Sequence, residues 1–90
     1  MHDAKPSVEI SNLFPNPATN KVSVKYDLKG ANNAQLEIRN VLGSLVKKVS
    51  INESNGLLNV DVSDLTNGVY FYSFIVNNEI IKSKKLIIQR

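Results

Sequence analysis

The stretch DVSDLTNGVYFYSFIV, residues Asp61–Val76, decides the fold because it joins a polar corner to the most aromatic run of the chain. The corner is Asp64–Gly68, where Asp and Asn side chains can cap their own backbone and Gly68 can take a positive φ without steric cost. The run after it holds four of the six aromatic residues in the sequence, Tyr70, Phe71, Tyr72 and Phe74. We therefore expect a turn that leads directly into a β-strand.

Tyr70 has the position of a structural tyrosine. It lies just after the corner and two residues before Tyr72. This is the layout of the tyrosine corner in immunoglobulin-like sandwiches, in which the hydroxyl bonds to backbone a few residues upstream. We expect Tyr70 to be largely buried, with its hydroxyl bonded to the backbone of the Asp64–Asn67 segment.

A strand of strictly alternating polarity precedes this stretch at Lys21–Leu28. Alternation of this kind indicates an antiparallel strand with one buried face. The residues predicted to face inward are Val22, Val24, Tyr26 and Leu28. Just before it, two prolines in Phe14–Asn20 fix φ and exclude the helical region for the residues that precede them. A strand beginning near Val8 must therefore stop or change sheets at Phe14–Asn20.

Further short runs of strand character lie at 35–40, 45–51 and 58–62, and none of the chain shows a convincing helical period. Adjacent Leu45 and Val46 interrupt the alternation, which indicates a bulge or an edge position. Seven such runs predict an all-β fold, and specifically an immunoglobulin-like antiparallel β-sandwich of about seven strands with Greek-key connections. A small barrel with the same strand count is the alternative.

Asn77-Asn78 predicts a two-residue hairpin between the last two strands, because Asn tolerates the positive φ of such turns. That register would pair, on one face, Val76 with Glu79, Phe74 with Ile81, Tyr72 with Ser83 and Tyr70 with Lys85. On the other face it would pair Ile75 with Ile80, Phe71 with Lys84 and Val69 with Leu86. This second face is apolar as well, so it is either covered within the fold or offered to a partner.

Length and composition limit the possible functions. At 90 residues the chain forms one domain, which we place at 8–90, with residues 1–7 as a linker end or cloning remnant. The only histidine, His2, lies in that tail, where a functional role is not expected. A net charge of +3 is too small to indicate a nucleic-acid partner, and the absence of cysteine excludes disulfides and thiolate metal sites. No apolar stretch typical of a signal peptide follows Met1, and no run is long enough for a membrane span, so we expect a domain acting outside the cell to be part of a longer precursor.

No catalytic or cofactor-binding constellation can be found in the sequence. Carboxylates occur singly, no Ser, His and acid combination is present, and the glycines form no phosphate loop. Oxygen ligands for calcium could come from Asn59, Asp61, Asp64 and Asn67, but these lack the spacing of a known calcium loop, and turn capping explains them better. Asn52-Glu53-Ser54 fits the N-glycosylation pattern, which is common by chance in an Asn-rich chain.

Four sequence blocks, taken in order, resemble one protein family. They are Phe14–Asn20, Asn40–Val46, Asp64–Phe71 and Lys84–Ile87. In this order and spacing they are similar to the type A C-terminal sorting domain of cargo proteins of the bacterial type IX secretion system, over nearly all of residues 12–90. The middle block departs from the family, which usually has Asp where this chain has Asn40, although Asn can make the same local turn contacts.

The resemblance implies a non-catalytic signal at the end of a larger exported protein. Its partners would be the outer-membrane secretion machinery and a sortase-like peptidase, and its route would lead through the periplasm to the cell surface or extracellular space. Recognition is then expected through shape, exposed backbone at a sheet edge and the end of the last strand. The residues we predict to take part are Pro15, Asn16, Pro17, Gly43, Gly68, Tyr70, Lys84, Lys85, Leu86 and Ile87.

Two other functional classes fit an all-β domain of this size. One is a carbohydrate-binding or adhesive module of a secreted enzyme, which usually needs a planar row of exposed aromatic side chains. Here the aromatic residues are concentrated on one strand, and two tyrosines are predicted to face inward, which argues against it. The other is a structural spacer, which would be expected inside a chain rather than at its C-terminus. The sequence leaves the cargo, the cleavage position and the oligomeric state open.

Overall fold

The computed structural model describes residues 8–90, so the tail of residues 1–7 with His2 lies outside the description. Residues 8–90 form strands and turns, and no helix among them is long and apolar enough to cross a membrane. The seven strands are β1 (Glu9–Ile10), β2 (Lys21–Asp27), β3 (Ala34–Asn40), β4 (Leu45–Ile51), β5 (Asn55–Asp61), β6 (Gly68–Val76) and β7 (Glu79–Ile88).

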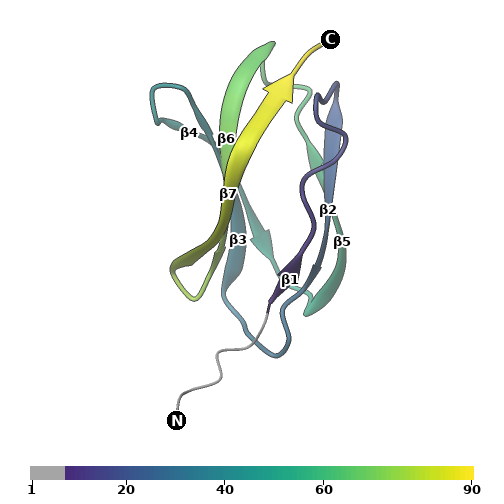
Figure 1. Cartoon of the computed structure of the whole chain (residues 1–90), viewed down its shortest axis with the longest axis vertical. Helices are drawn as coiled ribbons and strands as arrows, with labels where there is room; N and C mark the ends of the chain where they lie inside the picture. The colour runs from purple at the N-terminus through teal and green to yellow at the C-terminus, as the bar shows by residue number, and fades with distance from the viewer. Residues whose placement is uncertain (1–7) are drawn as a thin grey trace.

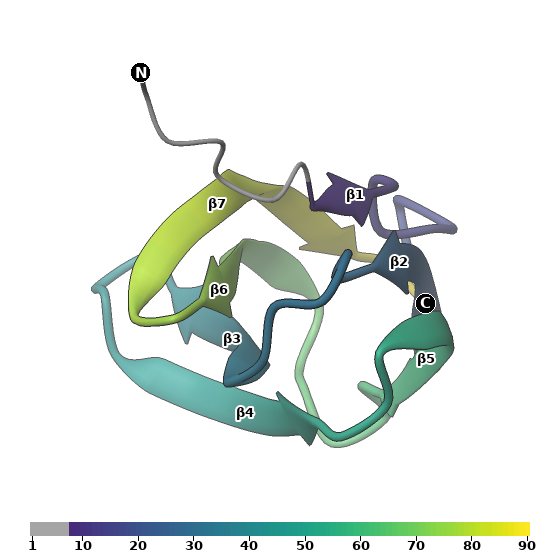
Figure 2. The same cartoon turned by 90° about the horizontal axis from the view of Figure 1, so that it is seen from below.

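The strands form two antiparallel sheets that face each other (Figures 1 and 2). One sheet has the order β1-β2-β5 and the other has the order β4-β3-β6-β7. The chain changes sheets between β2 and β3, between β4 and β5, and between β5 and β6. The predicted all-β sandwich is therefore confirmed, and the two sheets do not close into the barrel that was the alternative.

The placement of β4 bears on the finer immunoglobulin-like prediction. In the constant-type immunoglobulin sandwich the fourth strand lies on the sheet of the first, second and fifth strands. Here β4 lies beside β3 on the other sheet. The immunoglobulin-like arrangement thus stays a prediction, supported by the Tyr70 corner described below.

The core lies between the two sheets and is built from every second residue of the long strands. All four residues predicted to face inward in Lys21–Leu28 are buried, as are Leu36 and Ile38 of β3. The ring centroids of Tyr26 and Phe74 are 6.2 Å apart, which joins the two sheets through an aromatic contact. The remaining core side chains are Leu13, Ala18, Ala34, Ile51, Val60, Val62, Leu65, Tyr70, Tyr72, Val76, Leu86 and Ile88.

A bulge in β4 confirms the irregularity predicted at Leu45 and Val46. Ile38 lies opposite Lys47, but the next residue of β3, Arg39, lies opposite Leu45. Val46 is therefore the additional residue. The strand is also an edge of its sheet, so both parts of the prediction hold.

The register of β7 differs from the predicted one beyond the first two pairs. Both Asn77 and Asn78 take positive φ, and the pairs Val76–Glu79 and Ile75–Ile80 form as predicted. The ladder then shifts by one residue at Ile81. The other five predicted pairs are therefore wrong, and the observed pairs are Phe74–Lys82, Tyr72–Lys84, Phe71–Lys85, Tyr70–Leu86 and Val69–Ile87.

The shift has a clear physical reason. A continuous ladder would turn Lys85 and Ile87 toward the core and leave Leu86 outside, because side chains alternate strictly along a strand. With the bulge, Leu86 and Ile88 are fully buried and Lys85 is exposed. One unpaired residue near the hairpin therefore sets which side chains reach the core at the far end of the strand.

Candidate recognition surface

The four blocks that carry the family resemblance meet at one end of the sandwich, at the top of Figure 1. Gly68 pairs with Ile88 and Asn40 pairs with Tyr70, so the start of β6 and the ends of β3 and β7 lie together. Ala18 forms a bridge to Ile88. We call this region the motif end; it comprises Phe14–Asn20, Asn40–Ser44, Val62–Tyr70 and Lys84–Arg90.

Phe14–Asn20 lies along the outer edge of β7 at the motif end. The Asn16 amide donates to the carbonyl of Lys85 at 2.9 Å and accepts from the N–H of Ile87 at 3.0 Å. Ala18 continues the pairing, since its N–H donates to Ile87 at 2.7 Å and its carbonyl accepts from Gln89 at 2.8 Å. The backbone edge of β7 is therefore already paired over residues 85–89.

Arg90 closes the motif end from the other side. Its guanidinium donates to the carbonyl of Leu65 at 2.6 Å, to that of Val62 at 2.7 Å and to Asn20 Oδ1 at 3.0 Å. Its backbone N–H donates to Asn67 Oδ1 at 3.1 Å. The fork of an arginine can satisfy several carbonyl groups at once, which an ammonium on a flexible chain does less well. Arg90 is not among the site residues predicted from the sequence.

The tyrosine corner forms as predicted. Tyr70 is buried, and its hydroxyl donates to the carbonyl of Thr66 at 2.7 Å and lies 3.2 Å from the Thr66 hydroxyl. The prediction for Asp64 and Asn67 is wrong, because they do not cap their own backbone. Asp64 instead pairs with Lys47 at 3.1 Å, and Asn67 accepts from Arg90.

Asp61 provides the turn capping in this region. Its Oδ1 accepts from the N–H of Ser63 at 2.9 Å. Hydrogen bonds from Ser63, side chain and backbone, hold the pKa of the Asp61 carboxyl below its usual value. The prediction of turn capping is wrong for Asn59 as well, because Asn59 lies within β5 and accepts a hydrogen bond from Ser23 at 2.6 Å. In residues 8–90 no group of three or more His, Cys, Asp or Glu side chains is placed to hold a metal ion.

The turn between β3 and β4 is held by Asn40, which confirms that Asn can make the local contacts of the family's usual Asp. Its Oδ1 accepts from the N–H groups of Leu42 and Ser44, both at 3.0 Å. Gly43 has a φ of +86°, a conformation that favours glycine. Gly68, with a φ of +159°, is close to extended backbone. The turn presents Leu42, which is 87% exposed, together with Val41.

The second apolar face of β6 is not covered by the described residues. Phe71 is 45% exposed, and Val69 beside it on the same face is also exposed. Across the sheet, Phe71 lies opposite Arg39 on β3 and Lys85 on β7, and Arg39 lies opposite Leu45. The sequence left open whether this face is covered within the fold or offered to a partner, and the described residues leave it exposed. Leu86 is the exception, because the register shift buries it.

The predicted site residues divide into three groups. Asn16, between the exposed Pro15 and Pro17, bonds to Lys85 and Ile87, while Gly43 lies in the β3–β4 turn. Tyr70 and Leu86 are buried, so a partner that binds the folded domain would not touch their side chains. Lys84, Lys85 and Gly68 are exposed and Ile87 is half-buried. An unpaired backbone edge at the end of β7, which we expected for recognition, is not present over residues 85–89.

Exposed aromatic side chains do not form the planar row that a carbohydrate-binding module would use. In residues 8–90 the exposed ones are Phe14, beside the start of β2, and Phe71, on the outer face of the other sheet. Tyr26, Tyr70 and Tyr72 are buried. The described surface therefore gives no support to the carbohydrate-binding alternative.

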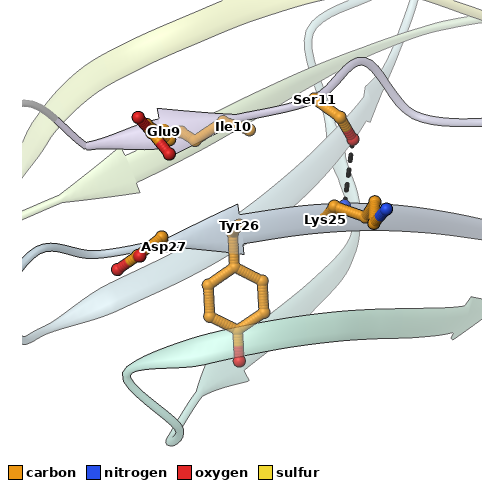
Figure 3. A pocket seen from close by; sticks show the side chains of 6 residues that line it. All are labelled: Glu9, Ile10, Ser11, Lys25, Tyr26 and Asp27. Carbon is orange, nitrogen blue, oxygen red and sulfur yellow. Dashed lines mark hydrogen bonds between the residues drawn. The ribbon is translucent and has the colours of Figure 1, made fainter.

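A shallow hollow of about 300 Å³ lies between β1 and β2 (Figure 3). Within it, the Ser11 hydroxyl donates to the carbonyl of Asn12 and accepts from the N–H of Lys25, both at 2.9 Å. The Tyr26 ring points away from β1, and burial raises the pKa of its hydroxyl. The Ser11 hydroxyl replaces a backbone contact in the ladder and has no base beside it, so the hollow lacks the parts of a nucleophilic site.

Comparison with known proteins agrees with this geometry. The family model for the secretion system C-terminal sorting domain matches residues 12–89, which includes the residues of all four blocks. No curated protein and no solved structure gives a significant match. The match covers most of the chain, and the four blocks that it spans build the motif end. This chain therefore belongs to the family of C-terminal sorting domains of the type IX secretion system.

Proposed function

We propose that this domain carries a larger cargo protein through the outer-membrane export machinery and is then removed by a sortase-like peptidase. Membership of the family implies contact with the secretion machinery and export to the cell surface or extracellular space. Domains of this family are non-catalytic in general. The route through the periplasm, the removal step and the absence of catalysis in this chain are our proposals.

The family match is the observation that carries this proposal, and the geometry of the motif end supports it. A sorting signal must be read from its surface, so its readable features should be fixed in position. At the motif end, Asn40 fixes the β3–β4 turn, and Asn16 and Arg90 fix the chain on both sides of the end of β7. Leu42 and Phe71 are exposed on this framework.

A reporter fusion tests the proposal. A signal peptide and a passive fluorescent protein are placed before the 90-residue chain and expressed in a type IX-competent bacterium. We expect the reporter outside the outer membrane and, in a matched fusion without the domain, in the periplasm. Mass spectrometry of the exported reporter should show loss of the domain. A reporter that stays in the periplasm with the domain attached would contradict the export proposal, and an exported reporter with the domain intact would contradict the removal step.

Truncation is a poor variant for this assay. Deletion of 84–90 removes the partners of Asn16 and the whole Arg90 cluster of hydrogen bonds, and it exposes core residues that pack on Leu86 and Ile88. Loss of export would then follow from misfolding as readily as from loss of a signal. Leu42→Asp is sharper, because this side chain is 87% exposed in a turn held by Asn40 and Gly43. Its matched control is Leu57→Asp on the opposite sheet, at 53% exposure.

A further inference from the structure

The outer face of the β4-β3-β6-β7 sheet has a particular order of side chains near the motif end. One row across the four strands reads Leu45, Arg39, Phe71, Lys85. The neighbouring row holds Val69 on β6 beside Ile87 on β7. Leu45, Val69 and Phe71 are all exposed, so three apolar side chains share this part of the face. We call these residues, with Arg39, Lys48 and Lys85, the outer-face patch.

Charge on the patch is unbalanced. Its cations are Arg39, Lys48 and Lys85. Apart from Glu79 at the hairpin end, the only carboxylate on the four strands of this sheet is that of Glu37. Glu37 already forms a 3.0 Å ion pair with Arg39 and accepts from Gln35 at 2.8 Å. Lys48 and Lys85 have no ion-pair partner within residues 8–90. Glu37 also lies opposite Lys48 across β3 and β4, so three cations share one carboxylate and the patch has a net charge of +2 beside three exposed apolar side chains.

The opposite sheet provides a comparison within the same molecule. Lys25 and Leu57 are paired across β2 and β5, and both are exposed. On that face Lys21 and Lys25 are matched in number by two carboxylates, those of Asp27 and Asp61, and Lys21 lies opposite Asp61. Leu57 is also the only large exposed apolar side chain of β2 or β5. The other sheet thus has neither the apolar cluster nor the excess of positive charge.

We infer that the outer-face patch binds an acidic protein segment with apolar side chains at its centre. Lys48 and Lys85 lie on the two edge strands, which are three strand spacings apart, or about 14 Å measured across the sheet. An extended segment covers this distance in roughly four residues. Apolar side chains between acidic ones would then meet Phe71 and its apolar neighbours, while the carboxylates meet the two lysines.

A protein segment fits the patch better than an anionic lipid surface does. Recognition of anionic membranes usually takes clusters of about four to eight Lys or Arg. The patch has three cations, and Arg39 is already held by Glu37 and by the carbonyl of Gly43 at 3.0 Å. The inference rests on the proposed function, since it gives the chemistry of the partner that the sorting signal would meet.

Peptide binding tests the inference directly. The probes are two labelled peptides, DDSLSLSDD and KKSLSLSKK, and the measurement is fluorescence anisotropy with the full 90-residue chain. We expect the acidic peptide to bind and the basic one not to bind. Phe71→Ser with Lys85→Glu should weaken binding by at least about tenfold, or roughly 1.4 kcal/mol. The control, Leu57→Ser with Lys25→Glu, also replaces one exposed apolar side chain by Ser and has the same net charge, and it should retain the affinity of the parent chain.

Single variants protect the test against a folding defect. Lys85→Glu and Lys25→Glu alter exposed side chains only, so a thermal melt should show both domains folded, and only the first should lose affinity for the acidic peptide. Equal loss in both variants would mean attraction to net charge alone and would overturn the inference. Absence of peptide binding, or stronger binding to anionic phosphatidylserine vesicles than to the peptide, would overturn it too.

The export assay separates this inference from the proposed function. If the parent domain exports the reporter and the Phe71→Ser, Lys85→Glu variant exports it equally well, the inference is wrong and the proposed function stands. If the parent domain does not export the reporter, the proposed function fails, and the peptide measurement still decides whether the patch binds acidic segments.

Discussion

The two ends of the four-stranded sheet are held together in different ways. At the motif end, side chains from distant parts of the chain bond to backbone groups, as Asn16 does with Lys85 and Ile87 and Arg90 does with Val62 and Leu65. At the hairpin end the chain turns locally, with Asn77 and Asn78 at positive φ, and the contact with the loop before β3 is a backbone bond, from the N–H of Asn77 to the carbonyl of Asn33 at 3.0 Å. The residues that identify the family are therefore largely residues that assemble one end of the fold.

This comparison separates two meanings of a family motif. Tyr70, Asn16 and Leu86 belong to the motif blocks, but their contacts are internal to the domain. Leu42 and Lys85 belong to the same blocks and have exposed side chains. A substitution in the first group acts first on stability, whereas one in the second acts on whatever the surface contacts. Variants chosen from the two groups should therefore give different results in a thermal melt.

The largest effect should come from the strand that connects the two ends. Leu86→Ala should lower the free energy of unfolding by about 3 kcal/mol, because it removes a fully buried side chain. Ile87→Ala, which alters a half-buried neighbour, should cost less than half as much. Urea denaturation of both variants measures this difference. The reverse order would mean that β7 follows the uninterrupted hairpin register.

Arg90 should have the next largest effect. Arg90→Ala removes three guanidinium hydrogen bonds to the motif end and should lower the free energy of unfolding by about 2 kcal/mol. This value is smaller than the sum for three charged hydrogen bonds because Arg90 is exposed. Arg90→Lys should recover only part of this, since Lys has no planar fork. Lys82→Ala on β7 is the comparison variant, with bonds to Ile10 and Asn12, and should cost clearly less. Equal losses for Arg90 and Lys82 would remove the distinction between the two ends.

Tyr70→Phe tests the corner itself. Loss of the hydroxyl leaves the Thr66 carbonyl without its 2.7 Å donor, and we expect a cost of about 1 kcal/mol or somewhat more. Thermal unfolding is a sufficient measurement. An unchanged midpoint temperature would show that the hydroxyl contributes no net stability to the corner.

The hairpin end should respond in the opposite direction. Asn78 has a φ of +65°, and Asn-Gly is the preferred pair for two-residue turns with positive φ at both positions. Asn78→Gly should therefore stabilise the domain by about a few tenths of a kcal/mol, because glycine takes a positive φ without steric cost. Asn78→Ala, which cannot adopt this φ as easily, should destabilise it. A loss of stability in both variants would assign Asn78 a role beyond the turn.

The smallest effect concerns acid. The folded-state pKa of Asp61 is lowered, so its contribution to stability is present above the unfolded pKa and is lost as pH falls through the folded one. Asp61→Asn keeps the acceptor for Ser63 and removes the titration. Between about pH 5 and pH 3, the midpoint temperature of Asp61→Asn should therefore fall slightly less than that of the parent domain. Identical pH dependence would exclude Asp61 as a contributor.

Local rules were sufficient for much of the fold. Alternation placed Val22, Val24 and Tyr26 correctly in the core, because a half-buried strand repeats every two residues. Tyr70 was predicted with its backbone partner, since the corner and the tyrosine are only four residues apart. The Asn77-Asn78 turn followed from the tolerance of Asn for positive φ.

Non-local contacts account for what the sequence did not predict. The bulge at Ile81 depends on which of two alternative faces of β7 meets the other sheet, and neighbouring residues alone do not determine this. Arg90 and Asn16 bond to carbonyl and N–H groups, which have no signature in side-chain patterns. Pairing along the edge of β7 therefore remained hidden, and an open edge was expected where Phe14–Asn20 lies.

The position of Asn16 also affects how the domain reaches its native state. Its amide bonds to residues 69 and 71 positions further along the chain, so this part of the sheet edge is completed only after almost the whole sequence is available. Closure of so long a loop carries a large entropy cost before any contact compensates for it, and folds dominated by such pairings form slowly. Early in synthesis, Asn16 and Ala18 have no β7 residues to bond to. Folding of this end therefore waits for synthesis of residues 85–87, and the domain acquires its final surface late.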